Sequence, residues 1–283
     1  MRSSRMNINK HLKLLNLVLI LGVLMLSSCH AQNTLSRSLK SPEGILQISF
    51  DNLGQQYILG ETMTLYKMKN DSTIWNRYIN NRLGTLTVLD VANPLRLLAY
   101  YQQFQTLICL DNNLAESGVL NFNNLGFGYV RAVCISEDNN IWILDEYAKS
   151  LKKIDPSGKV LQEGIPDFNL RFDPDKPITL KARDAKVYLF QPNLGLLVYD
   201  VFGNRISTDL TSYQNVTEIW QGKLFDVTEK GILIYDLYNI ISPPKIIEVP
   251  DRKSSIFFNL SKKEFQYLDE FNQIRKGSLP VLE

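Results

Sequence analysis

Short apolar segments separated by polar turns run through residues 44 to 283, and no long helical periodicity interrupts them. The segment 129–164 shows this best, with apolar stretches ending in VCIS, IWILD, SLKKID and KVLQEG and the turns EDNN, EYAK and PSG between them. Runs of this length, rich in Val, Ile, Leu, Tyr and Phe and bounded by Asn, Asp, Gly and Pro, are typical of strands joined by hairpins. The segment therefore predicts one antiparallel sheet of four strands.

The same unit recurs along the chain. Second-strand segments read QYILG, RLLAY, NIWILD, KVYLF, KLFDV and EFQYLD, and markers within them are spaced by 41, 43, 46, 37 and 41 residues. Six units of four strands with a period of about 40 residues are typical of a β-propeller, because stacked blades bury faces that a lone sheet would expose. The pattern resembles the six-bladed NHL and TolB propellers over residues 44–283, which implies an all-β, six-bladed fold.

Two features of this fold stay open in the sequence. A pair of β-sandwich domains is the chief alternative architecture. The way in which the ring closes is also open, because Pro280 disfavours a final strand in GSLPVLE, and the segment 34–40, TLSRSLK, is an alternative closing strand.

The first 43 residues follow a different pattern. Residues 1–13 carry four basic side chains and no acid, and residues 14–26 are apolar except for Asn16. This is typical of a secretory signal peptide, although an uncleaved anchor is an alternative. Residues 26–29, LSSC, resemble the lipobox of bacterial lipoproteins, which implies cleavage before Cys29 and a membrane anchor on the Cys29 thiol. The predicted parts are a signal peptide (1–28), a lipidated Cys29 with a tether (29–43) and a propeller (44–283).

The residues after Cys29 bear on location. His30 follows the cysteine, where an Asp would favour retention in the inner membrane, so the resemblance implies the outer membrane. No acidic run of the kind that marks surface export follows, which favours an orientation towards the periplasm.

Composition excludes several classes of function. Without residues 1–28 the chain has 27 basic and 29 acidic side chains, so we expect no nucleic-acid partner. The two histidines, His11 and His30, both precede the predicted propeller, which excludes Ser-His-Asp triads and histidine zinc sites there. The inner-strand acids Asp90, Asp184 and Glu218 fall at different depths. We therefore predict no catalytic residue, no metal site and no cofactor.

Several recurrent residues are best explained by structure. Third strands end in Asp111, Asp155, Asp200 and Asp236, each before a turn whose backbone amides a carboxylate can bind. Two cysteines, Cys109 and Cys134, lie in apolar segments and are expected to be buried thiols, with a disulfide as the alternative. The three tryptophans, Trp75, Trp142 and Trp220, lie within strand segments and are expected in blade cores.

Three connections are candidates for binding a partner. The loops 121–129 and 164–178 join blades, and the turn 145–149 joins the second and third strands of the third blade. They should share one face and flank that blade. Aromatic residues and Arg are enriched in interface hot spots, and long loops in compact folds are often functional. The candidate residues are Phe122, Phe127, Tyr129, Asp145, Glu146, Lys149, Phe168, Arg171 and Phe172.

The sequence as a whole favours a lipid-anchored envelope scaffold that binds a protein and has no catalytic activity. Two alternatives use the same architecture. A metal-dependent hydrolase resembling propeller lactonases would use acids in the central funnel, and a carbohydrate or small-ligand binder would use the aromatic loops.

Overall fold

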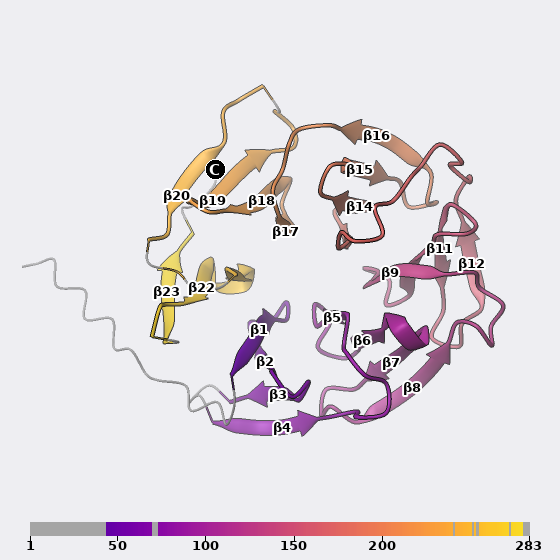
Figure 1. Ribbon diagram of the computed structural model, residues 1–283, viewed down its shortest axis with the longest axis horizontal. Coiled ribbons are helices and arrows are strands. Elements are labelled where there is room, and N and C mark those ends of the chain that lie inside the picture. The colour runs from indigo at the N-terminus through magenta and orange to yellow at the C-terminus, as the bar shows by residue number, and fades with distance from the viewer. Residues whose placement is uncertain are drawn as a thin grey trace, which may run out of the picture. The chain divides into compact units, whose positions relative to one another are not determined.

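A computed structural model describes residues 44–69, 73–239, 241–250, 252, 255–271 and 273–279. The predicted signal peptide, lipobox, tether and closing segment 34–40 lie outside these residues, as does Pro280. The described strands form six antiparallel sheets that surround a common centre as the blades of a propeller (Figure 1). The predicted six-bladed, all-β fold is confirmed.

Each of the first three blades has four strands in sequence order. Blade 1 contains β1 (Ile45–Phe50), β2 (Gln56–Gly60), β3 (Leu65–Met68) and β4 (Ile74–Tyr78). Blade 2 contains β5 (Val88–Asp90), β6 (Leu97–Tyr101), β7 (Thr106–Leu110) and β8 (Glu116–Asn121), with a 3-10 turn, η1 (Gln102–Phe104), between β6 and β7. Blade 3 contains β9 (Val130–Ile135), β10 (Ile141–Asp145), β11 (Ser150–Ile154) and β12 (Val160–Glu163).

The remaining blades follow the same order. Blade 4 contains β13 (Thr179–Arg183), β14 (Lys186–Gln191), β15 (Gly195–Tyr199) and β16 (Arg205–Asp209). Blade 5 contains β17 (Val216–Trp220), β18 (Lys223–Thr228), β19 (Gly231–Asp236) and β20 (Lys245–Glu248). Blade 6 has three strands among the described residues, β21 (Phe257–Asn259), β22 (Glu264–Leu268) and β23 (Ile274–Ser278), with the 3-10 turn η2 (Leu260–Lys262).

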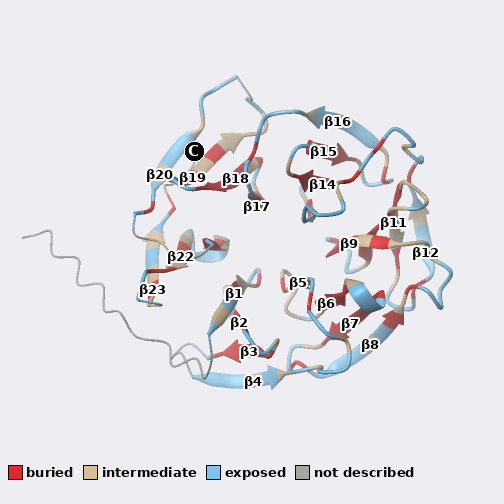
Figure 2. Cartoon of the chain, in the orientation of Figure 1, coloured by how far each residue is buried: buried red, intermediate tan, exposed pale blue. Residues whose placement is uncertain are grey.

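The first strand of each blade lies at the centre, and in blades 1 to 5 the fourth strand lies at the rim (Figure 1). Inner strands of neighbouring blades contact one another, as β9 does with β5 and β13, and β21 with β1. Second strands such as β6 and β10 are buried throughout, whereas the rim strands β12 and β16 are mostly exposed (Figure 2). This radial order gives two faces. The loop face carries the connections between blades and between second and third strands, and the hairpin face carries the other turns.

Apolar packing between adjacent blades makes the core. The largest cluster joins blade 3 to blade 4, where Trp142 and Leu144 pack with Val187, Leu189 and neighbouring residues. Comparable clusters join blades 2 and 3, 1 and 2, 4 and 5, and 5 and 6. Burying one large aliphatic or aromatic side chain contributes about 1.5–3 kcal/mol, so these interfaces supply most of the driving force for closure.

Polar contacts add a second link between inner strands. The Asp90 carboxylate of blade 2 accepts a hydrogen bond from the Ile135 amide of blade 3, at 2.9 Å. The Glu137 carboxylate of blade 3 accepts from the amides of Asp184 and Ala185 in the first turn of blade 4, each at 3.1 Å. Both turn residues have left-handed backbone angles, with φ of 53° and 56°. This tight turn directs its amides towards the neighbouring blade.

The recurrent aspartates are turn residues, as predicted. Asp200 Oδ1 accepts from the amides of Phe202 and Asn204 at 2.9 Å, and Asp111 and Asp155 bind their hairpins in the same way. Asp236 accepts from the Tyr238 amide. Each carboxylate therefore accepts hydrogen bonds from hairpin amides that would otherwise be hydrogen-bonded to water.

The cysteine prediction is confirmed and the tryptophan prediction is wrong for one residue. Cys109 and Cys134 are free and buried in different inter-blade clusters. Trp142 is buried, but Trp75 is half exposed because it lies on the rim strand β4, where few residues are covered by another layer. Across the described part of the chain, no helix has the length and apolar character needed to cross a membrane.

The inter-blade carboxylate of Asp90 should be measurable in stability. Replacing Asp90 by Ala leaves the buried Ile135 amide without its acceptor, which costs about 1–3 kcal/mol of unfolding free energy. Asp90→Asn keeps an oxygen acceptor and should lose less. Urea unfolding of both variants checks this. An equal loss in the two variants would show that the hydrogen bond does not stabilise the inner ring.

Candidate functional site

Three segments meet on the loop face of blade 3. The Glu146 amide donates to the Tyr129 carbonyl at 2.8 Å, which joins the turn 145–149 to the loop 121–129. The Asp167 amide donates to the Lys149 carbonyl at 2.9 Å, which joins the same turn to the loop 164–178. The predicted arrangement, with two between-blade loops flanking the third blade on one face, is therefore confirmed.

Buried side chains hold these segments in place. The Asp145 carboxylate, which is 2% exposed, accepts from Lys152 Nζ at 3.0 Å and from the Ala148 amide at 3.1 Å. The Arg131 guanidinium lies 3.5 Å from Glu146 and donates to the Asp173 carbonyl at 2.8 Å. Asp145 also accepts from the Gly128 amide of the loop 121–129, and Arg131 joins the turn 145–149 to the loop 164–178, so the loops form one braced surface.

Two of the candidate aromatics belong to the core. Phe122 is fully buried and packs edge-on against Phe127, with ring centroids 5.7 Å apart. Phe172 is 9% exposed and lies beneath Lys149 Nζ at 5.7 Å. Their apolar faces fill the spaces under the loops, and Phe127 is itself half buried on the cluster between blades 2 and 3. Together with Asp145, these residues position the surface and are not exposed to a partner.

The accessible part of the site is aromatic and charged. Tyr147 is 75% exposed and Phe168 is 70% exposed. The Tyr147 ring lies 6.1 Å from the half-buried ring of Tyr129, and exposed Arg171 donates to the Phe168 carbonyl, which fixes the loop tip. We call the accessible set the blade-3 surface, and its members are Tyr129, Glu146, Tyr147, Lys149, Phe168 and Arg171.

Tyr147 is not among the residues predicted from sequence, although it lies in the EYAK turn. The predicted residues of this turn, Asp145, Glu146 and Lys149, are the charged ones. The period of the strands carries the missing signal, since Asp145 ends β10 and Tyr147 therefore occupies the tip of the turn. A large aromatic residue at a turn tip has no core to enter, and its exposure could have been inferred.

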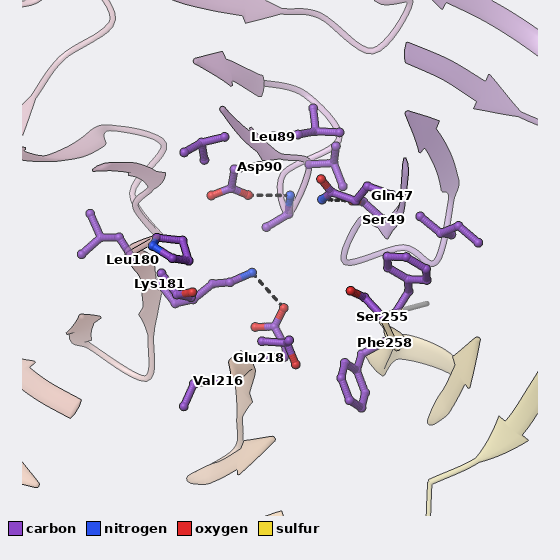
Figure 3. Close-up of a pocket in the computed structure, with 18 of the residues that line it drawn as sticks. Gln47, Ser49, Leu89, Asp90, Leu180, Lys181, Val216, Glu218, Ser255 and Phe258 are labelled. Carbon is purple, nitrogen blue, oxygen red and sulfur yellow. Dashed lines mark hydrogen bonds and ion pairs between the residues drawn. The ribbon is translucent and has the colours of Figure 1, made fainter. Parts of the chain in front are cut away.

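A second candidate site is the central channel. A cavity of about 420 Å³ is lined by all six inner strands and opens among the residues that precede them on the loop face. A second cavity of about 630 Å³ lies towards the hairpin face, and both are lined by Arg183 and Glu218. Figure 3 shows the ion pair between Lys181 and Glu218, which lie on neighbouring inner strands, and Asp90 on another inner strand.

The Glu218 carboxylate is the electrostatic centre of this channel. It lies 3.0 Å from Lys181 Nζ and 3.9 Å from the Arg183 guanidinium, and its side chain is 15% exposed. Burial alone would raise the pKa of Glu218, but attraction to Lys181 and Arg183 outweighs burial and holds the pKa below its ordinary value. The carboxylate is therefore ionised and neutralised by cations of the neighbouring strand.

The other inner acids are also engaged. Asp90 binds the Ile135 and Ala92 amides, and Asp184 lies in a turn and accepts from the Gly222 amide. Within the described ranges, no group of three His, Cys, Asp or Glu side chains is placed to hold a metal ion. Lys181 and Glu218 occupy the third positions of the successive inner strands β13 and β17, and this alignment could have revealed their pairing from sequence.

Comparison with known proteins supports the fold. No protein-family model and no curated protein matches the chain. Virginiamycin B lyase from Staphylococcus aureus is similar in structure, with 12% identity, coverage of 87% of each chain and a TM-score of 0.52. The Cps50 (Swd1) β-propeller domain from Myceliophteria thermophila is 10% identical, covers 86% of this chain and 98% of its own, and gives a TM-score of 0.54.

A chain of the Mitotic Checkpoint Complex is also similar, with 10% identity, coverage of 82% of this chain and 73% of that chain, and a TM-score of 0.53. At these identities the likenesses show the β-propeller fold alone.

The Glu218 ion pairs make stability depend on pH. Because the folded-state pKa is lowered, the carboxylate stabilises the fold above its ordinary pKa of 4.5, and this contribution is lost as pH falls through the folded-state pKa. Glu218→Gln should lower the unfolding free energy by about 2 kcal/mol at pH 7. Unfolding at pH 7 and pH 3 measures the difference from the wild type, which should shrink at pH 3. A difference that is equal at both pH values would contradict this account.

Proposed function

We propose that this protein is a lipid-anchored component of the bacterial cell envelope whose propeller is a non-catalytic scaffold for another envelope protein. The blade-3 surface is the proposed contact. One observation carries the proposal: Tyr147 and Phe168 are large, highly exposed aromatic residues on loops that are braced by buried ion pairs and hydrogen bonds. Rigid exposed aromatics lose little conformational entropy on binding and supply much of the energy at interface hot spots.

The similar structures are consistent with either a binding or a catalytic role. The Mitotic Checkpoint Complex is an assembly, so a propeller can serve there as one part of a complex. Virginiamycin B lyase is an enzyme, and its variant with one histidine replaced by alanine is described as catalytically inactive. No histidine occurs between residues 44 and 283 of this chain. We therefore do not propose a histidine-dependent lyase reaction for this propeller.

A hydrolase in the central channel has less support. Glu218 is neutralised by two cations, and the carboxylates of Asp90 and Asp184 bind backbone amides. A metal would have to compete with these contacts. Polar side chains such as Gln47 and Ser49 line the channel and could bind a small ligand. No residue of the channel belongs to the proposed protein contact.

Replacing both exposed aromatics should release the partner. We expect Tyr147→Ala with Phe168→Ala to reduce recovery of the partner at least tenfold when the tagged full-length protein is purified from solubilised membranes. The two residues together then contribute at least about 1.4 kcal/mol to binding. Quantitative mass spectrometry measures the recovery.

Phe271→Ala is the matched control, because Phe271 is 71% exposed on blade 6. Its recovery of the partner should equal that of the wild type. Equal recovery by the double variant as well would remove the blade-3 surface from the proposal.

The membrane anchor is a separate part of the proposal. Cys29→Ser should abolish incorporation of labelled palmitate, because it removes the thiol to which the lipid would be attached. Metabolic labelling measures this effect. Unchanged labelling of the variant would refute lipidation at this residue.

A further inference from the structure

A third pocket lies on the hairpin face, away from the blade-3 surface. It has a volume of about 510 Å³, within the usual range for small-molecule sites. The first turn of blade 1, at Leu53–Gln56, forms one side. Pro94 and Leu95 of blade 2 and Asn259 and Lys262 of blade 6 complete it. The pocket therefore spans three blades at the place where the first and last blades meet.

The lining of this pocket is strongly basic. Four lysines line it, Lys67, Lys69, Lys262 and Lys276, against two acids, Asp51 and Glu264. Asp51 is 4% exposed, and its carboxylate accepts from the Leu53 and Gln55 amides at 2.9 Å. The Asp51 carboxylate is therefore hydrogen-bonded to backbone amides of its own turn. Among the described residues, Lys69, Lys262 and Lys276 are exposed and no acid lies within ion-pair distance of them.

Lys67 adds an unusual buried cation beside this pocket. Only 2% of Lys67 is exposed, yet no described carboxylate lies within ion-pair distance of its Nζ. The ammonium instead donates to the carbonyl of Asn112 at 2.7 Å and lies 5.0 Å from the ring centroid of Trp75 and 5.6 Å from that of Tyr57. Burial lowers the pKa of Lys67. Asp51 and Asp111 attract the Lys67 ammonium from beyond ion-pair distance, so an anion in the pocket would add a closer negative charge.

Trp75 supplies an apolar surface in this polar pocket. It is 50% exposed on the rim strand β4 and lines the same cavity. An exposed indole face attracts the polarised C–H groups of a flat, partly apolar ring. The amide side chains of Gln55, Gln56 and Gln266 add hydrogen-bonding groups, and Gln56 Nε2 donates to Gln266 Oε1 at 3.2 Å across the two blades.

We propose that this pocket binds an anionic saccharide, with the indole of Trp75 against a sugar ring and the lysines around a carboxylate or phosphate on it. The outer strands β4 and β23 have one described partner each, so an acidic peptide is the alternative occupant that the experiment below tests. A bare anion would make no use of Trp75. This site is separate from the proposed protein contact, and either can fail without the other.

Isothermal titration calorimetry on the full-length protein in detergent tests the assignment. The probes are trigalacturonate, glucose 6-phosphate, neutral maltotriose, inorganic phosphate and a pentaglutamate peptide. We expect binding of at least one charged sugar, no binding of maltotriose, weaker binding of phosphate and peptide, and an affinity that falls as salt rises. Trigalacturonate and glucose 6-phosphate distinguish a carboxylate from a phosphate as the recognised group.

Two variants and a matched control locate the binding. Lys69→Gln with Lys262→Gln should weaken binding of the charged sugar at least tenfold, and Trp75→Ala at least fivefold. Lys159→Gln with Lys245→Gln removes two exposed lysines from other blades and should leave the affinity unchanged. Thermal unfolding confirms that each variant is folded, and the salt dependence of the wild type gives a test that needs no variant.

Three results would overturn the proposal. The first is no binding of either charged sugar at millimolar concentration. The second is binding of inorganic phosphate or pentaglutamate as tight as that of the sugars, which would indicate a simple anion or peptide site. The third is an equal loss of affinity in the control and the lysine variant, which would indicate a diffuse charge effect.

Discussion

Packing between the faces of neighbouring blades is the interaction on which the rest of this structure depends. Every large apolar cluster is shared by two blades, and side chains such as Trp142 and Val187 pack in a cluster that joins blades 3 and 4. Among the described residues, the meeting of blades 6 and 1 has the smallest such cluster, with only Ile48, Phe257, Leu268 and Ile274 buried. The basic pocket that Lys67 lines lies beside this interface. The smallest inter-blade apolar cluster and a lysine-lined pocket therefore lie at the same place in the ring.

A closed ring also explains how a surface of loops can be rigid. Asp145 and Arg131 connect segments that come from two between-blade connections and one hairpin. Tyr147 and Phe168 are thereby exposed on segments that hydrogen bonds join to one another. The same geometry separates the blade-3 surface on the loop face from the lysine pocket on the hairpin face, since the two use different strands and turns. One propeller can therefore contact more than one kind of ligand.

Periodicity predicted the fold well because each blade repeats the same local chemistry. The second-strand segments and the turn aspartates such as Asp200 were all placed correctly, since alternation and hairpin chemistry depend on near neighbours. The site was predicted less well. Phe122 is core and Trp75 is not, because burial in a propeller depends on which rim strand or neighbouring blade covers a residue. That information depends on contacts between residues far apart in sequence.

Photocrosslinking in living cells tests the central claim most directly. A photoreactive phenylalanine analogue would replace Phe168 in the full-length protein, and a second strain would carry it in place of Phe271, which is equally exposed on blade 6. The scaffold account predicts one crosslinked envelope protein from position 168 and none from position 271. No crosslink at position 168, or the same mixture of products at both positions, would contradict it.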